Sequence, residues 1–150
     1  MFDERNVVIA SGDNEARARW IGGLRERFDV IEVGTRIALE VVLTDRRPVA
    51  LVFDVTLPGL GSAAELSHIR NLSPSTRTIV LSDRETIGEG LSALLAGAKG
   101  YCARAIDPVS LGKAVASVRN GELVGQADAR QRPGGGARRP NGRRAERSRQ

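Results

Sequence analysis

The chain has 150 residues and a hydrophobic content of 41%, which predicts one domain with a globular core and little left over. Aromatic residues make up only 3% and Cys102 is the single cysteine, so the core must be aliphatic, and an internal disulfide or a cysteine-based metal cluster is excluded. The net charge of +5 is unevenly placed: residues 126–150 contain eight arginines and two acids, a balance of +6 that leaves −1 for residues 1–125.

Nothing in the sequence indicates export or membrane insertion. The first residues, Met1–Arg5, are charged and are not followed by the apolar region of a signal peptide. No apolar run approaches the roughly 20 residues that span a bilayer. A single cysteine also suits a reducing compartment, so the sequence predicts a cytoplasmic protein without membrane contact.

Strand and helix patterns alternate along the chain. Runs of β-branched residues bounded by turn residues predict strands, and apolar residues three or four apart predict helices. In chain order, we expect a strand at 6–10, a helix at 15–28, a strand at 28–33, a helix at about 37–45, a strand at 50–54, a helix at 63–70, a strand at 76–82, a helix at 85–96, a strand at 101–103 and a helix at 108–120.

Capping and turn residues support several of these boundaries. Asp13 or Asn14 can cap the first helix, and Pro108 after Asp107 suits the first position of the last one. The second helix is predicted from its apolar residues Ile37, Ala38, Val41 and Val42.

Five strands alternating with five helices imply βαβ units and a parallel sheet covered on both faces. At this length the expected fold class is α/β, a flavodoxin-like (βα)5 doubly wound sheet with strand order 2-1-3-4-5. We expect the folded domain to cover residues 5–122.

Residues 123–150 are expected to form a disordered tail rich in Arg, Gly and Pro, because they hold too few large apolar side chains to offset chain entropy. No helix-turn-helix pattern is found there, so sequence-specific DNA binding is not expected. The arginines could contact nucleic-acid phosphates without sequence preference and with strong salt dependence, or the tail could simply be solvated.

One apolar run ends on an acid. The run from Ala50 to Phe53 leads into Asp54, and Pro58-Gly59 follow. Asp54 is therefore predicted at the carboxyl end of a buried strand, the edge at which open α/β sheets carry their sites. A carboxylate there must be solvated, paired or bound to a cation. The alternative is that Asp54 only caps the following turn.

Other polar residues follow the neighbouring strands. Ser11 and Asp13 follow the first strand, Ser82 ends the fourth and Arg104 follows the fifth. One rim of the sheet is thus expected to hold acids, a hydroxyl and a cation together. Each has a simpler alternative: a helix cap for Asp13, a locally bonded hydroxyl for Ser82 and a solvated surface charge for Arg104.

These residues, with Leu57-Pro58-Gly59 after Asp54 and Gly97-Ala98-Lys99-Gly100-Tyr101 before Arg104, resemble the receiver domains of bacterial two-component response regulators. The resemblance covers roughly residues 5–121. The last helix and the Asn120-Gly121-Glu122 that follow it are similar to receivers of the LuxR/NarL type, which normally continue into a helix-turn-helix domain that this sequence lacks.

The resemblance implies a phosphorelay protein whose usual output is transcription regulation. It makes Asp54 the acceptor of a phosphoryl group from a sensor histidine kinase, and so a phosphoprotein rather than a turnover enzyme. It makes Ser82 the hydroxyl that bonds the phosphate, Tyr101 the aromatic switch and Arg104 the cation that pairs with the phosphate. It also implies Mg²⁺ held by Asp54, by the backbone carbonyl of Thr56 and by acids after the first strand.

The sequence departs from the family at two places. Ser11 and Gly12 stand where the family usually has two acids, and Arg104 stands where it has Lys. Asp13 lies one or two positions late, and an adjustment of the loop could bring it inward as a metal ligand. Arg keeps the charge but presents a planar fork. The lost acids make Mg²⁺ uncertain, and because about 1.4 kcal/mol is tenfold in rate, phosphorylation could fall by orders of magnitude.

Two functions therefore stay open. The first is a receiver that accepts phosphate on Asp54 and signals through protein contacts. The second is a degenerate receiver that works as a protein-binding or dimerisation module without phosphorylation. In that case the face from the fourth to the fifth helix would contact a partner or a second copy, with candidates Leu91, Leu95, Tyr101 and Val115.

Overall fold

A computed structural model describes residues 3–57, 63–83, 93, 94 and 96–125. All strands run parallel in one sheet of order β2-β1-β3-β4-β5-β6, which confirms the expected flavodoxin-like order and extends it by one strand. The elements are β1 (Asp3–Ala10), α1 (Asn14–Leu24), β2 (Asp29–Val33), α2 (Arg36–Arg46), β3 (Pro48–Asp54), α3 (Ala63–Leu72), β4 (Arg77–Ser82), β5 (Gly100–Ala103), α5 (Pro108–Arg119) and β6 (Val124–Gly125).

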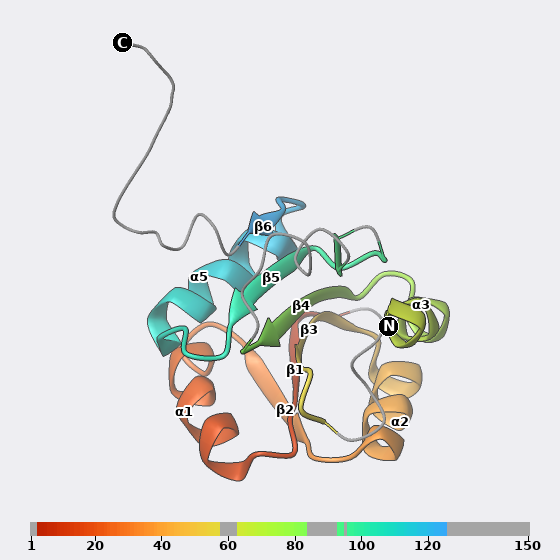
Figure 1. Cartoon of the computed structure of the whole chain (residues 1–150). Coiled ribbons are helices and arrows are strands. Elements are labelled where there is room, and N and C mark those ends of the chain that lie inside the picture. The colour runs from red at the N-terminus through yellow and green to blue at the C-terminus, as the bar shows by residue number, and fades with distance from the viewer. Residues whose placement is uncertain (1–2, 58–62, 84–92, 95, 126–150) are drawn as a thin grey trace, which may run out of the picture.

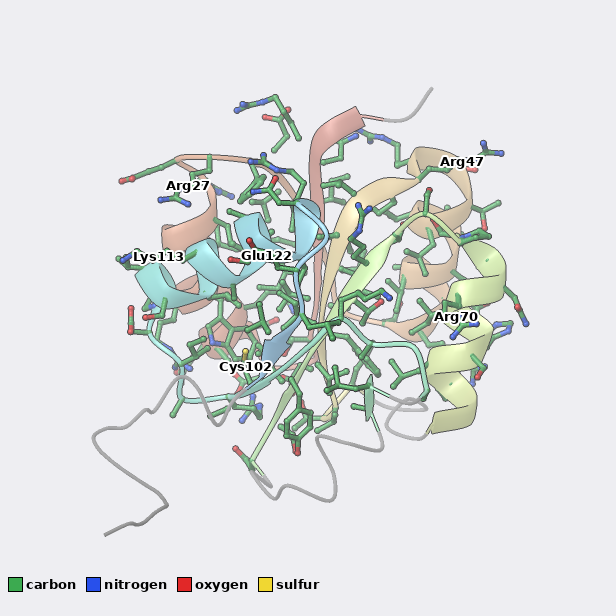
Figure 2. The ribbon with its side chains drawn as sticks, turned by 90° about the horizontal axis from the view of Figure 1, so that it is seen from above. Arg27, Arg47, Arg70, Cys102, Lys113 and Glu122 are labelled. Carbon is green, nitrogen blue, oxygen red and sulfur yellow. The ribbon has the colours of Figure 1, made fainter. Side chains whose placement is uncertain are left out.

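The helices cover both faces of the sheet (Figure 1). Helices α1 and α5 pack on one face, and α2 and α3 pack on the other. The side chains of β3 are buried along its whole length, as expected for a central strand covered on both sides. Cys102 of β5 is buried on the α1 and α5 side (Figure 2). Because the strands are parallel, their carboxyl ends lie along one rim of the sheet.

The sixth strand lies beyond the domain boundary that the sequence suggested. Val124 pairs with Gly100, and Gly125 pairs with Tyr101. The Val124 N–H donates to the carbonyl of Lys99 at 2.9 Å. Two residues are too few to show a strand pattern, so only the structure extends the fold from residue 122 to residue 125. The rest of the expected tail, residues 126–150, lies outside the described residues.

Helix α1 is shorter than predicted. It ends at Leu24 rather than near Phe28, and the Phe28 N–H donates to the Leu24 carbonyl at 2.9 Å in the turn that follows. Phe28 is only 2% exposed, so it packs in the core from a turn. Because Phe28 is buried, the apolar periodicity of the sequence continues to it, beyond the end of the helix. Gly22 and Gly23 weaken the helix itself.

Of the four residues that predicted α2, only Ala38 and Val42 pack against the core, and they are partly buried. Ile37 is 76% exposed and Val41 is 54% exposed, whereas Leu39 and Leu43 are buried against the sheet. Because this helix carries apolar residues on both its buried and its exposed side, the pattern predicted the helix but identified only part of its buried side.

The helix expected at 85–96 falls mostly outside the described residues, as do Leu91 and Leu95. None of the helices that the structure describes is long and apolar enough to cross a membrane.

Candidate functional site: a buried carboxylate and its arginine

Asp54 ends β3 and its side chain is completely buried. It is the only Asp or Glu among the buried residues that the structure describes. The Thr56 N–H donates to Asp54 Oδ1 at 3.1 Å, and the Leu57 N–H donates to the Asp54 carbonyl at 2.9 Å. Asp54 therefore does cap the following turn, but the bond from the Thr56 N–H is only one of the contacts that its carboxylate makes.

Arg104 forms a two-point contact with this carboxylate. Its Nε donates to Oδ1 at 2.9 Å and its Nη2 donates to Oδ2 at 3.0 Å. Such a fork matches the planar geometry of a carboxylate, which a lysine cannot do. The Arg104 side chain is only 17% exposed, so the solvated surface charge considered above is wrong.

Neighbouring residues hold Arg104 in this position. Its guanidinium lies 5.6 Å from the centre of the Trp20 ring, within cation–π range. The Trp20 Nε1–H donates to the Arg104 carbonyl at 3.3 Å, and the Arg104 N–H donates to the Ser82 carbonyl at 3.1 Å. The orientation of Arg104 is thus fixed from α1 and β4 as well as by Asp54. Trp20 is a site residue that we did not anticipate, because in the sequence it reads only as part of an apolar helix face.

Ser11 is the second residue whose role we did not anticipate. Its Oγ donates to Asp54 Oδ2 at 2.7 Å and accepts from the Asp13 N–H at 3.0 Å, and it is fully buried. The sequence placed Ser11 at this rim, but only as a residue that stands in place of an acid, without a hydrogen bond of its own to Asp54. The available signal was register: Ala10 pairs with Phe53, so the next residues on each strand, Ser11 and Asp54, fall side by side.

Asp13 caps α1, which confirms it, rather than Asn14, as the capping residue. Its Oδ1 accepts from the N–H groups of Glu15 and Ala16, each at 3.1 Å. Its Oδ2 accepts from Arg104 Nη2 at 3.2 Å. Asp13 therefore also belongs to the cluster, where it shares the guanidinium with Asp54.

The cluster favours the ionised forms of both carboxyls. Burial alone would raise the pKa of Asp54, but hydrogen bonds from Arg104, Ser11 and the Thr56 N–H together outweigh it and lower that pKa. The Ala16 N–H and the Arg104 side chain lower the pKa of Asp13. The hydrogen bond to Asp54 raises the pKa of Arg104 further, so the guanidinium is permanently charged.

Comparison with solved structures identifies this architecture. The receiver domain of the response regulator NarL from Mycobacterium tuberculosis aligns with a TM-score of 0.73 and 20% identity, over 80% of this chain and 99% of that one. A two-component response regulator of the LuxR family from Aurantimonas sp. SI85-9A1 aligns with a TM-score of 0.72 and 23% identity, over 84% and 92%. The fold is that of a response-regulator receiver domain.

Sequence comparison gives a related result. No protein-family model matches the sequence. The transcriptional regulatory protein PrrA of Mycobacterium tuberculosis is 28% identical over 116 residues, which are 75% of this chain and 48% of PrrA. The chain thus spans about half the length of the curated relatives that it matches.

Ser82 and Tyr101 lie close to the rim on the next two strands of the receiver fold. Both residues are buried, Ser82 at 3% and Tyr101 at 4% exposure. Val115 is also fully buried. Tyr101 and Val115 therefore cannot contact a partner in this conformation, which corrects two of the four candidates given for that face.

The oxygen donors at the rim do not fit a divalent cation as arranged. No group of three or more His, Cys, Asp or Glu within the described ranges could hold a metal ion. The two carboxylates that a Mg²⁺ ion would use, those of Asp54 and Asp13, both contact Arg104 instead. A neighbour with the same fold, a response regulator from Burkholderia pseudomallei, was solved with a phosphorylated aspartic acid and a calcium ion; it is 17% identical, with a TM-score of 0.64, over 79% of this chain and 72% of that one.

Proposed function

We propose that this chain is a two-component receiver in which Asp54 accepts a phosphoryl group and passes the signal on through protein contacts. The observation that carries the proposal is the buried carboxylate at the carboxyl end of β3, kept ionised by an arginine. A carboxylate must be ionised to act as a nucleophile. The hydroxyl of Ser82 at the end of β4 and the cation of Arg104 after β5 are placed on neighbouring strands, where phosphoryl oxygens could reach them.

The chemistry needs one donor. One hydrogen-bond donor leaves an Asp54 oxygen, the freed oxygen attacks the phosphorus of a phosphohistidine, the O–P bond forms as the P–N bond breaks, and the departing imidazole nitrogen takes up a proton. Arg104 would then pair with phosphoryl oxygens, for which its fork is suited. The product is an acyl phosphate on the protein itself, so the chain acts as an acceptor and not as a turnover enzyme.

The donor in this proposal is a sensor histidine kinase, and the output follows the relatives. PrrA is named as a transcriptional regulatory protein, and this chain aligns with about half of it. We therefore propose a role in a signalling pathway that controls transcription, with this receiver as the phosphorylated part.

Intact-mass measurement after incubation with acetyl phosphate tests the proposal. We expect a gain of one phosphoryl group in the wild type, none in Asp54→Asn, and an unchanged gain in Asp45→Asn, which removes an exposed carboxylate on α2. If the wild type gains no mass under conditions that label an ordinary receiver, phosphoryl acceptance is wrong, and the chain is a binding module that does not use phosphorylation.

A further inference from the structure

We propose that the Arg104 guanidinium takes the place of a divalent cation at Asp54, so that the site binds no metal in its resting state and accepts a phosphoryl group without one. The absence of a resting metal follows from the contacts of Asp54 alone. Phosphoryl acceptance without a metal rests on the proposed function.

The lone pairs of Asp54 are already in use. An ionised carboxylate offers about four acceptor positions. Four donors occupy them: Arg104 Nε and the Thr56 N–H on Oδ1, and Arg104 Nη2 and the Ser11 hydroxyl on Oδ2, at 2.7–3.1 Å. A Mg²⁺ ion binds carboxylate oxygens directly, at about 2.0–2.1 Å. It could reach Asp54 only by displacing one of these donors.

The position of the guanidinium leads to the same conclusion. Asp54 and Asp13 both contact Arg104, and Asp83 lies 3.8 Å from its Nη1. A divalent ion placed among them would repel the guanidinium at short range. Because arginine stays protonated at every accessible pH, the cation is always present. Trp20 and the capping residue Asp13 hold it in place, so vacating the carboxylate would also break those contacts.

This arrangement gives the two departures from the receiver pattern a common explanation. A lysine in place of Arg104 could make only one of the two fork bonds, and an acid in place of Ser11 would face Asp54 with a second negative charge. Arg104 and Ser11 therefore act as a pair: the fork supplies the positive charge, and the serine supplies the remaining donor.

Trp20 provides a direct readout of metal binding that does not require phosphorylation. It is the only tryptophan in the chain, it is buried, and it contacts Arg104. We expect no change in the tryptophan fluorescence of the wild type with millimolar Mg²⁺ or Mn²⁺. Arg104→Ala, and Arg104→Lys if the alanine variant does not fold, should show a saturable response that the additional change Asp54→Asn removes. A saturable response in the wild type would overturn the proposal, and so would its absence in both folded Arg104 variants.

The phosphorylation half is tested with acetyl phosphate in EDTA or in Mg²⁺. We expect labelling rates that agree within about twofold for the wild type, and labelling of Arg104→Lys that depends on Mg²⁺. Labelling of the wild type only with Mg²⁺ would refute the proposal that Arg104 replaces the metal, but it would support Asp54 as the acceptor. No labelling in either solution would refute the proposed function, while the fluorescence titration would still decide whether Arg104 replaces the metal.

A second inference comes from the opposite end of the sheet. A cavity of about 680 Å³ lies at the amino ends of β3, β4 and β5, roughly 20 Å from Asp54 along β3. Four cations line it: Arg70, Arg77, Lys99 and Arg119. None of its lining residues is acidic. The ion pairs formed among the described residues include none of these four cations.

Two of the cations are held in place by other contacts. Arg70 crosses over Gly97, and its Nη1 donates to the Ala96 carbonyl at 3.5 Å. The Arg119 guanidinium lies 5.2 Å from the centre of the Phe28 ring. Arg70 and Arg119 are also in the last turns of α3 and α5, where cations offset the helix dipole. That effect does not explain Arg77 and Lys99, which precede or begin strands.

We infer that this cavity binds a small phosphate-bearing ligand with at least two negative charges. Its volume is in the range of small-molecule sites, and a polyanion would relieve the mutual repulsion of the cations. The inference does not depend on Asp54.

Calorimetric titration of the full chain with pyrophosphate and with ATP tests this inference. We expect binding that Arg77→Glu with Lys99→Glu weakens at least about tenfold, a difference of about 1.4 kcal/mol. The control Arg27→Glu with Arg25→Glu changes the net charge equally on the α1 side of the sheet, where Figure 2 shows Arg27, and should leave the affinity unchanged. Equal weakening in both double variants, no binding at all, or binding of a nucleic-acid strand but of neither small ligand would overturn the inference.

Discussion

Asp54 is held by four hydrogen bonds that come from three different parts of the chain: the segment after β1, the turn after β3 and the residue after β5. At the scale of single residues, the Asp54 carboxylate therefore has its hydrogen-bonding positions filled by donors from the protein itself. Removing one member leaves a buried polar group without its partner, which costs more than the hydrogen bond itself contributes. Single substitutions here should change both stability and the pKa of Asp54.

Ser11→Ala removes the shortest of these bonds. Asp54 Oδ2 loses the donor at 2.7 Å and the Asp13 N–H loses its acceptor. We expect the free energy of unfolding to fall by about 1–3 kcal/mol, measured by urea denaturation at neutral pH. Ser67→Ala on the exposed side of α3 is the matched control and should change it by less than about 0.5 kcal/mol. Equal effects of the two variants would contradict the role given to Ser11.

The lowered pKa of Asp54 predicts a pH dependence of stability. The pKa is lower in the folded chain, chiefly because the hydrogen bonds from Arg104 and Ser11 outweigh burial. The folded state therefore binds fewer protons, and the stabilisation is complete above about pH 4 and is lost as the pH falls through the folded pKa. Urea denaturation between neutral and acid pH should show a smaller acid-induced loss for Asp54→Asn than for the wild type. The prediction is wrong if the two curves run parallel.

At the scale of elements, the receiver fold depends on one close approach between α1 and α5. A Cβ on Gly23 would lie 1.8 Å from the Pro108 carbonyl oxygen, and a Cβ on Gly112 would lie 2.5 Å from the Gly23 carbonyl oxygen. The two helices can meet at this distance only because both positions are glycine. The approach also positions the segment that carries Trp20 next to the β5–α5 connection that carries Arg104.

Gly22 and Gly23 are neighbours with opposite expected behaviour. Gly23→Ala forces α1 away from α5, and we expect a loss of about 1–3 kcal/mol of stability. At Gly22, by contrast, a Cβ would have no neighbouring atom within 4 Å. Gly22→Ala should therefore stabilise the helix by about 0.5–1 kcal/mol, since alanine loses less backbone entropy. Thermal unfolding of both variants measures the difference, and a gain for Gly23→Ala would show that the helices can separate without cost.

At the scale of the whole molecule, the sequence predicted most of the fold because its signals are long or strongly punctuated. The run ending at Asp54 before Pro58-Gly59 and the cap at Asp107-Pro108 each mark one place in the chain. Strand β6 could not be predicted, since two residues carry no periodicity.

The site was predictable in position but not in bonding. Arg104 and Ser11 were placed at the correct rim by strand order. The fork onto Asp54, the hydroxyl bond from Ser11 and the support from Trp20 depend on side-chain directions across four separate elements. No local pattern encodes those directions, so the sequence could not decide between a surface arginine and a buried ion pair.

The charge of the whole chain gives the last prediction. Removing residues 126–150 changes the net charge from +5 to −1, because that segment carries +6. If its arginines contact nucleic-acid phosphates, the full chain should bind single- or double-stranded DNA without sequence preference, and the affinity should fall steeply between low and moderate salt as counterions are released. Fluorescence anisotropy with labelled DNA of two unrelated sequences measures this binding. The shortened chain should show none, yet should unfold at the same urea concentration, since it keeps every strand of the sheet from β1 to β6. A shortened chain that still binds DNA would instead assign the contact to the cations of the folded domain, and a single preferred sequence would contradict the expectation that this chain lacks operator recognition.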